Sequence, residues 1–471
     1  MVLMMIAWAP SCAFHAAPWA SQAYRKRSRR RRTRGALRVP RCQVYHEGLA
    51  TFELPPEGSF YRAASRPVRD LGVLAALALT EETGDRLHVA DLLSGVSAVR
   101  ALRYAAEANA KLVLVNDAIS GPGRAVLRRN STYAAPDTVW IQRHEDLFQL
   151  ACSSEWTSSF DLVDIDAFGT GAPEVASGVL RFLRCSRTRS KLAGRCYTQT
   201  DAAPAPGALL YACSTASVTA AGLNPQKARQ TYGAEIARHA AVHEQGLRLL
   251  ITMVRHHALQ AGLIARPLFS YYHRAGDTFR VMFRVTLEEN LISKAATTAD
   301  HDAGLLYNCV ACGQLWCIVT PNENLAQCPG CGIPVMAPRV RTSGPFYLGP
   351  LHDPYFVERM LTIISEAPSD HFDGGTQTAL KLMLDEATRQ GHPFYYRIGD
   401  LARRAGCSPP PLFRFLQRLE LAEQAYLDAG RLPRQVVTAQ WRAARASVDA
   451  QGIRTGLPMP AILEAMREIS S

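Results

Sequence analysis

Short apolar runs alternate with amphipathic stretches between residue 87 and about residue 285. Five runs have the length and composition of buried strands, at residues 87–93, 111–117, 137–142, 160–166 and 207–214. Two longer stretches, residues 97–109 and 243–262, repeat apolar side chains with a helical period. Such alternation predicts a doubly wound α/β sheet.

The pattern changes on both sides of the fifth strand. Residues 263–274 and 278–287 read as an antiparallel pair that closes the sheet, whereas residues 186–207 read as a polar loop. Beyond residue 296 come a cysteine cluster, a Gly/Pro-rich connector and mainly helical sequence. The pattern therefore predicts one domain over residues 47–295 and a second over residues 296–471, which agrees with a chain of 471 residues.

The positive charge of the chain is concentrated at its N-terminus. The net charge is +12, but residues 1–46 hold ten Lys or Arg and no acid, so the remaining residues carry only +2. Binding of a polyanion by the body of the protein must therefore depend on a local patch. No apolar run is long enough to span a membrane, and we expect no membrane partner.

The acid-free, Arg/Ser-rich start has the composition of an organellar transit peptide. A short apolar segment ending in Ala13-Phe14 precedes the basic run and resembles the bipartite plastid presequences of some algae. We expect residues 1–46 to be a presequence outside the fold, with the plastid favoured over the mitochondrion. A nuclear-localisation or RNA-tethering arm is the alternative.

Three acids follow the first three predicted strands. Asp91, Asp117 and Asp146 stand where strand ends bind ligands in open α/β sheets, and Asp117 is positioned to accept both ribose hydroxyls of a nucleoside. The first loop has one glycine, Gly95, instead of the G-x-G-x-x-G of a dinucleotide site. The pattern therefore favours an adenosine ligand without phosphate, S-adenosylmethionine. Helix caps or solvated loop acids are the alternative.

The fourth strand, in FDLVDIDAFG (residues 160–169), ends in an acid and an aromatic residue. A carboxylate at Asp166 can accept an N–H bond of a base's exocyclic amine and later take its proton, and Phe168 can stack on an extruded base. Strand alternation places Asp164 on the same face as Asp166, so both are expected to line the pocket, with Asp161 solvated. A plain helix cap is the alternative for Asp166.

Several stretches together resemble the tRNA guanine-26 N2-dimethyltransferases. They run in family order across residues 47–77, 94–108, 112–119, 161–169, 232–251 and 344–361. The resemblance implies a Rossmann-like methyltransferase sheet, a C-terminal domain that contacts tRNA, and mono- then dimethylation of guanine N2 with S-adenosylmethionine as donor. It also implies roles for individual residues: cofactor contacts at Arg69, Arg100, Asp117, Asp146 and Leu147. Catalysis is assigned to Asp166 and Phe168, with Phe168 near the base, and a further substrate contact to Phe60 near the entrance.

Three departures from the family pattern bear on the substrate site. Ala167 stands where the family usually has Pro, and Ser217 lies near a usual Asp. Residues 426–439 match the family's closing segment only faintly. Contacts of the last lobe with the substrate are therefore the least constrained by the resemblance.

Four of the twelve cysteines are clustered. Cys309, Cys312, Cys328 and Cys331 form a C-x2-C-x15-C-x2-C pattern, in which each C-x-x-C-G knuckle directs two thiolates to one point. The spacing predicts a closed structural zinc site without a catalytic role. The second domain is therefore expected to be a zinc-bearing α+β domain.

Residues 395–425 have the length of a helix-turn-helix. Arg397, Arg403, Arg404, Arg414 and Arg418 in this segment are candidates for tRNA phosphates, although a solvated basic face is as compatible with the pattern. We expect a monomer that acts on tRNA. Two other functions remain open: an amino-methyltransferase acting on another RNA or DNA base, and a non-catalytic zinc-containing RNA-binding protein.

Overall fold

The computed structural model describes residues 42–56, 61–185, 207–215, 224–287, 303–319, 326–389, 392–430 and 442–470. Residues 40–471 form one compact unit. A hairpin of β1 (Gln43–Glu47) and β2 (Ala50–Leu54) opens the described part. The predicted presequence boundary at residue 46 therefore falls inside β1, and residues 1–41 lie outside the described part.

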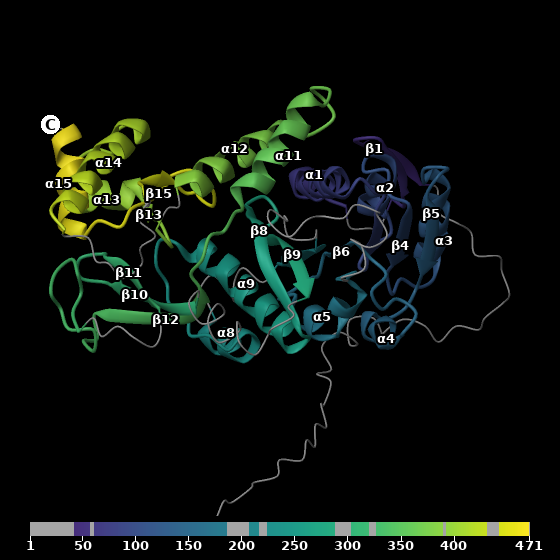
Figure 1. Cartoon of the computed structure of the whole chain (residues 1–471), viewed down its shortest axis with the longest axis horizontal. Helices are drawn as coiled ribbons and strands as arrows, with labels where there is room; N and C mark the ends of the chain where they lie inside the picture. Colours follow the sequence, from purple (N-terminus) through teal and green to yellow (C-terminus); the bar gives the residue numbers. More distant parts are fainter. Residues whose placement is uncertain are drawn as a thin grey trace, which may run out of the picture. The chain divides into compact units, whose positions relative to one another are not determined.

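A seven-stranded mixed sheet forms the centre of this unit (Figure 1). Its strand order is β5-β4-β3-β6-β7-β9-β8, with β7 to β9 and β9 to β8 antiparallel and the other pairs parallel. The strands are β3 (His88–Asp91), β4 (Leu112–Asn116), β5 (Val139–Arg143), β6 (Leu162–Ile165), β7 (Ala208–Ser214), β8 (Leu263–His273) and β9 (Thr278–Leu287). The predicted α/β sheet and its closing antiparallel pair are confirmed.

Helices cover both faces because the strands are apolar on both sides. Val89 and Val113 pack with α1, α2, α11 and α12, whereas Ala90 and Leu114 belong to the opposite core, which includes residues of α4, α5 and α9. The helices are α1 (Arg66–Thr83), α2 (Val99–Ala106), α3 (Pro122–Asn130), α4 (Leu147–Cys152), α5 (Ala172–Ala176), α8 (Pro225–Tyr232) and α9 (Val242–Gln260).

The second half of the chain adds two small sheets and five helices among its described residues. An antiparallel sheet has the order β11-β10-β12, and another has the order β13-β15-β14. The strands are β10 (Ala303–Cys309), β11 (Leu315–Val319), β12 (Val340–Tyr347), β13 (Tyr396–Arg397), β14 (Ala444–Arg445) and β15 (Gly452–Arg454). The helices are α11 (Pro354–Glu366), α12 (Gly374–Arg389), α13 (Ile398–Ala405), α14 (Leu412–Asp428) and α15 (Met459–Ser470).

The two predicted domains share their buried cores. Val357 of α11 and Leu380 of α12 pack in the cluster that contains Leu71 of α1, so these helices cover the central sheet. The predicted boundary near residue 296 lies outside the described residues, and the division into domains stays a prediction. Within the described part of the chain, no helix combines the length and apolarity needed to cross a bilayer.

Candidate active site

The candidate site lies where β3 and β6 end side by side. These strands run parallel, and Asp91 of β3 is in register with Asp164 of β6, so their carboxyl ends meet at one edge of the sheet. The chain turns from β3 to β4 on one side and from β6 to β7 on the other, which makes this edge the switch point of the sheet. Ligands bind at such a point because the loops diverge there.

Three carboxylates at this edge surround two guanidinium groups. Arg100 of α2 lies 3.0 Å from Asp91 (Nη2 to Oδ1), 3.6 Å from Asp164 (Nε to Oδ2), and also pairs with Asp166 Oδ2. Arg280 of β9 donates to Asp164 Oδ1 at 2.7 Å and to Asp166 Oδ1 at 3.1 Å. Each arginine therefore bridges the strand-end acids of β6.

Two buried tyrosines hold Arg280 and Asp164, the inner members of this cluster, in place. The guanidinium of Arg280 lies over the Tyr211 ring, 3.6 Å from its centroid, and the hydroxyl of Tyr104 donates to Asp164 Oδ2 at 2.8 Å. Asp164 has no solvent-accessible surface. The expectation that Asp164 lines the pocket is therefore wrong: its side chain is fully buried, where it holds Arg280 in place.

The charges of the cluster do not balance. When all five side chains are ionised, three carboxylates face two guanidinium groups, a net charge of −1. Burial raises the pKa of Asp91 to about 7 against the opposing charge of Arg100, and the neighbouring charges of Asp164 and Asp166 raise this pKa further. Asp91 Oδ2 is also buried without a hydrogen-bond partner among the described residues. The cluster thus holds a buried carboxylate oxygen without a partner among the described residues.

Asp166 remains ionised at neutral pH. Burial by itself raises the pKa of Asp166, but the charges of Arg100 and Arg280 outweigh burial and lower this pKa to about 2. Its side chain is 37% exposed, unlike Asp91 and Asp164. Asp166 is therefore the carboxylate of the cluster that can reach a substrate.

The turn after Asp166 is held by the end of the neighbouring strand. The amide of Gly169 donates to Thr215 Oγ1 at 2.7 Å, and the Thr215 amide donates to the Gly169 carbonyl at 2.7 Å. Ala167 is buried, while Phe168 is 72% exposed. These bonds fix the turn without the family's proline and direct an aromatic side chain outward beside Asp166.

The remaining predicted cofactor residues surround the loop after β3. Asp117 Oδ2 accepts from the Gly95 amide at 2.8 Å, and Gly95 has φ +67° with open space where a Cβ would point. Asp146 caps α4, because its Oδ1 accepts from the Phe148 amide at 2.9 Å, and Leu147 is buried behind it. The helix-cap alternative thus describes Asp146 in this structure, and its contact with a cofactor stays a prediction.

Arg69 is held by β1 in this structure. Its guanidinium donates to both oxygens of Glu47, at 2.7 and 2.5 Å, and its charge is near enough to lower the pKa of Asp166. Its contact with the cofactor's carboxylate stays a prediction. Phe60 and Ser217 lie outside the described residues.

The sequence prediction was wrong for Asp161 and missed Arg280. Asp161 is 1% exposed, not solvated, and its carboxylate accepts from the His88 amide at 2.9 Å, which ties β6 to β3. Arg280 carries a detectable signal, because it is a charged residue between Phe279 and Val281 in an otherwise apolar strand. Its partners on β6 are visible only in three dimensions.

The four clustered cysteines converge as predicted. Cys309 and Cys331 have their Sγ atoms 3.6 Å apart, as do Cys312 and Cys328, and all four Sγ atoms lie within 4.8 Å of one another. Four thiolates about 2.3 Å from one tetrahedral zinc ion are separated by about 3.8 Å. The arrangement fits such an ion and leaves no fifth protein ligand among the described residues.

Comparison with known proteins decides the family. The family model for N2,N2-dimethylguanosine tRNA methyltransferase matches residues 43–467. The chain belongs to this family. The match includes both the strand-end cluster and the four cysteines, so both are parts of a methyltransferase of this family.

Individual members of the N2,N2-dimethylguanosine tRNA methyltransferase family are distant. The tRNA (guanine(26)-N(2)/guanine(27)-N(2))-dimethyltransferase of Aquifex aeolicus is 24% identical over 438 residues, covering 91% of this chain and 96% of the relative. The tRNA (guanine(26)-N(2))-dimethyltransferase, mitochondrial, of Saccharomyces cerevisiae is 25% identical over 355 residues, covering 69% of this chain and 56% of the relative.

The fold agrees with a solved member of the family. Trm1 from Pyrococcus horikoshii, solved in complex with S-adenosyl-L-methionine, superimposes with a TM-score of 0.66 over 90% of this chain and 99% of that chain, at 19% identity. This similarity extends beyond the seven-stranded sheet to the C-terminal half of the family fold.

Proposed function

We propose that this chain methylates the exocyclic N2 of guanine 26 in tRNA, first to the monomethyl and then to the dimethyl product, with S-adenosylmethionine as donor. The main observation in support is that the Asp166–Phe168 turn is exposed beside a cluster of net charge −1. The chain that holds this turn belongs to the family named above. S-adenosylmethionine supplies a methyl group on a sulfonium and has a net charge of +1.

The residues of the cluster suit this cofactor. Asp91 Oδ2 is an unused buried acceptor for an ammonium, and the net −1 of the cluster is balanced by a cation. Arg100 pairs with Asp166, and the charge of Arg69 reaches Asp166; following the family resemblance, we assign the carboxylate end of the cofactor to these two guanidinium groups. Asp117, beside Gly95, is left to accept ribose hydroxyls, and Asp146 with Leu147 to bound the adenine.

Asp166 orients the guanine. A carboxylate that accepts an N2–H bond localises the nitrogen lone pair, which is otherwise delocalised into the ring, and directs it toward the donor. When the N2–C bond forms, the bond between the methyl group and the sulfonium sulfur breaks and the sulfur leaves as a neutral thioether. The nitrogen then carries a positive charge and is a strong acid. A carboxylate with a pKa of about 2 is then basic enough to take the proton.

Phe168 supports the extruded base. Guanine must leave its stack at a cost of a few kcal/mol before its N2 can reach a protein carboxylate. An aromatic ring 72% exposed beside Asp166 recovers part of this cost by stacking on the base. Phe60, outside the described residues, is proposed at the entrance of the site on the family resemblance alone.

We propose that Cys309, Cys312, Cys328 and Cys331 hold a structural zinc ion. A closed site of four thiolates offers no position for a substrate, so the ion acts on stability and not on the reaction. A chain of the same family in yeast mitochondria supports an organellar location, and the acid-free basic N-terminus favours the plastid. Fusing residues 1–46 to a fluorescent protein tests the targeting, and nuclear fluorescence would contradict it.

Incubation with labelled donor and total tRNA, followed by nucleoside analysis, tests the function. We expect N2-methylguanosine and N2,N2-dimethylguanosine, and no label in a transcript that has adenosine at position 26. The variant Asp166→Asn, measured at saturating cofactor, should lose 10²–10⁴-fold in single-turnover rate, the usual contribution of a positioned acid or base. Label in another base, or wild-type turnover by this variant, would overturn the assignment.

A further inference from the structure

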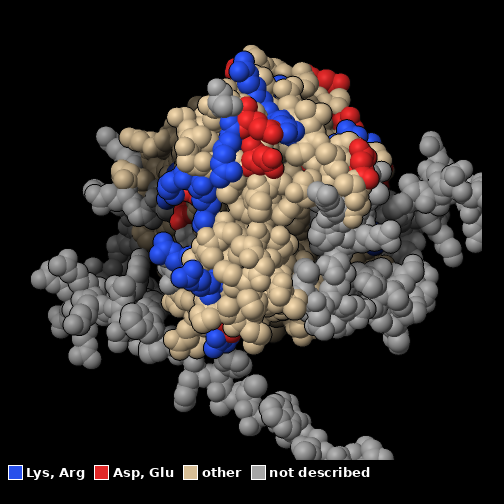
Figure 2. All heavy atoms as spheres, turned by 90° about the vertical axis from the view of Figure 1, so that its left-hand side faces the viewer, with Lys and Arg blue, Asp and Glu red and all other residues tan. Residues whose placement is uncertain are grey.

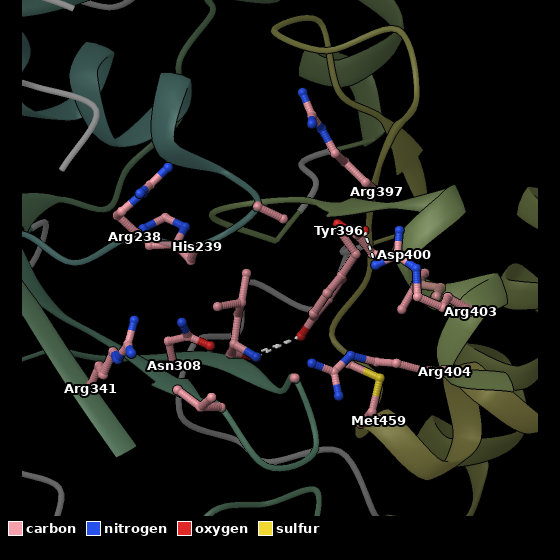
Figure 3. Close-up of a pocket in the computed structure, with 15 residues that line it drawn as sticks. Arg238, His239, Asn308, Arg341, Tyr396, Arg397, Asp400, Arg403, Arg404 and Met459 are labelled. Atoms are coloured by element: carbon pink, nitrogen blue, oxygen red, sulfur yellow. Dashed lines mark hydrogen bonds and ion pairs between the residues drawn. The ribbon is translucent and has the colours of Figure 1, made fainter. Parts of the chain in front are cut away.

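An arginine-lined cleft of about 570 Å³ opens between the three-stranded sheet β11-β10-β12 and α13, away from the cluster at Asp166. Arg238, His239 and Arg341 lie along one side, and Arg397, Arg403 and Arg404 along the other (Figure 3). We call these six residues the arginine cleft. On this face of the molecule, Lys and Arg side chains gather in a band (Figure 2).

The charge of the arginine cleft is mostly uncompensated. Its lining contains five arginines and one acid, Asp400, a net charge of +4. Asp400 pairs with Arg403 at 3.1 Å, and Asp449, outside the lining, pairs with Arg397 at 2.6 Å. Arg238, Arg341 and Arg404 are exposed and have no carboxylate partner among the described residues. They are available to an external anion.

The two sides of the cleft are joined rigidly at its floor. The buried hydroxyl of Tyr396 bonds both the amide and the carbonyl of Leu315 at 3.0 Å, and Gln314 Nε2 donates to the same hydroxyl at 3.1 Å. Gln314 Oε1 in turn accepts from the amide of Met459 at the start of α15. The arginines are thus carried by walls whose spacing is already set.

One short segment connects the arginine cleft to the candidate active site. The hydroxyl of Tyr232 lies 3.4 Å from the Thr170 carbonyl, next to the Asp166–Gly169 turn, and Arg238 follows Tyr232 by six positions. Six residues span at most about 22 Å. Between them Glu235 exchanges backbone hydrogen bonds of 2.9 and 2.8 Å with Gly344 of β12. The same short segment thus contacts the turn after Asp166 and lines the arginine cleft, so an extended polyanion bound in the cleft can continue toward Asp166.

We propose that the arginine cleft binds the phosphodiester backbone of the tRNA next to the target nucleotide. This inference rests on the proposed function, because it takes the base at Asp166 to belong to an RNA. Exposed guanidinium groups spread over two walls fit a chain of phosphates better than one small anion, which needs convergent buried donors. Their contribution is electrostatic and falls with salt.

The test compares tRNA binding by wild type and by the double variant Arg341→Gln/Arg404→Gln. Both side chains are exposed, so we expect the melting temperature and the cofactor affinity to stay unchanged. The tRNA dissociation constant should rise about tenfold at low salt, and the slope of log affinity against log salt should fall by about 2, one for each lost phosphate contact. Lys381→Gln on α12, an exposed cation outside the cleft, is the matched control and should leave both unchanged.

The possible outcomes distinguish a failure of the cleft proposal from a failure of the proposed function. If wild type methylates tRNA but the double variant keeps its affinity and salt slope, the arginine cleft is overturned and the proposed function stands. If wild type neither binds nor methylates tRNA, both fail. Polyglutamate is the competing class of anion: if it binds as tightly as tRNA and depends equally on Arg341 and Arg404, the cleft serves an acidic protein and the RNA assignment is overturned.

Discussion

At the scale of single residues, four aspartates near the strand ends differ because their surroundings differ. Asp161 ties two strands together, Asp164 holds Arg280, Asp91 retains an unused acceptor, and Asp166 is partly exposed between two arginines. Burial raises the pKa of Asp91, while two guanidinium charges lower that of Asp166. One residue type thus supplies buried clamps and, in the proposed function, a cation site at Asp91 and a proton acceptor at Asp166.

Cofactor affinity should depend on pH through Asp91. With a pKa near 7 in the free protein, Asp91 is mostly protonated at pH 6 and ionised at pH 8, and only the ionised form attracts an ammonium. We expect the affinity for S-adenosylmethionine, measured by calorimetry, to be about tenfold weaker at pH 6 than at pH 8. Asp91→Asn should bind S-adenosylmethionine weakly at both pH 6 and pH 8. If this variant kept the pH dependence of wild type, Asp91 would be excluded as its cause.

Substitution of Arg280 should lower the free energy of unfolding far more than substitution of Arg284 on the same strand. Arg280→Met removes the nearer of the two cations of the buried Asp164, the other being Arg100 at 3.6 Å, and breaking a buried pair in this way costs about 3–5 kcal/mol of unfolding free energy. Arg284 forms a partly exposed pair with Glu82 at 2.8 Å, so Arg284→Met should cost about 1 kcal/mol or less. Urea unfolding of both variants measures the difference, and equal losses would contradict the assigned role of Arg280.

At the scale of elements, the first cysteine knuckle helps to position one wall of the arginine cleft. The first cysteine knuckle is closed by backbone bonds from Gly313 to Cys309 and from Cys309 to Gln314, at 2.7 and 2.9 Å. Gln314 then bonds Tyr396 at the floor of the arginine cleft, and Arg404 donates to the Ala311 carbonyl at 3.3 Å. The predicted zinc site therefore supports one wall of the cleft.

Removing the metal should loosen this element and weaken tRNA binding. We expect about one zinc per chain by elemental analysis in wild type, and none in Cys328→Ser, because structural zinc typically contributes about 10–16 kcal/mol of binding free energy. The variant should melt at a lower temperature and bind tRNA less tightly. Cys317→Ser, a buried cysteine of β11 outside the cluster, should keep its zinc; a metal-free wild type with the same melting curve would contradict the prediction.

At the scale of the whole described molecule, the C-terminal elements are integrated into the methyltransferase fold. Glu244 of α9 accepts from Arg248 at 2.8 Å, from Arg454 of β15 at 2.9 Å, and from the Phe394 amide at 2.9 Å. All of these groups are buried. A single carboxylate thus connects a helix of the central sheet with the small sheet that carries α13.

Acid should destabilise the molecule through this carboxylate. Burial raises the pKa of Glu244, but Arg454 and Arg248 outweigh it and lower this pKa from 4.5 to about 2. The stabilisation, about 3 kcal/mol, is therefore complete above pH 4.5 and is lost as the pH falls toward 2. Glu244→Gln should unfold at lower urea at pH 7 and show a weaker loss on acidification.

The matched control for this prediction is Glu235→Gln. Glu235 lies nine positions earlier and forms an exposed pair with Arg229. We expect the urea unfolding midpoint of Glu235→Gln to match that of wild type both at pH 7 and after acidification. An acid sensitivity of Glu244→Gln equal to that of wild type would show that other groups govern the loss.

Most of the sheet was predictable from the sequence because its strands are apolar on both faces and their ends carry acids. Every predicted strand from residue 87 to residue 287 has a counterpart, from β3 to β9. The cysteine spacing likewise predicted four convergent thiolates, since two knuckles of fixed geometry leave few arrangements. Local pattern determined these features because each depends on residues close together in the chain.

Only the tertiary structure decided how charges from distant segments are combined. Arg280 meets Asp164 and Asp166 because β9 lies beside β7 in the sheet, and strand order is a global property. The same holds for the arginine cleft, which brings Arg238 to Arg341 and Arg404 from three separate segments. The sequence by itself determined the sheet, the strand-end acids and the cysteine cluster. The packing of distant elements decided which acid is exposed, which is clamped, and where uncompensated positive charge collects, because burial and charge balance depend on neighbours that are remote in the chain.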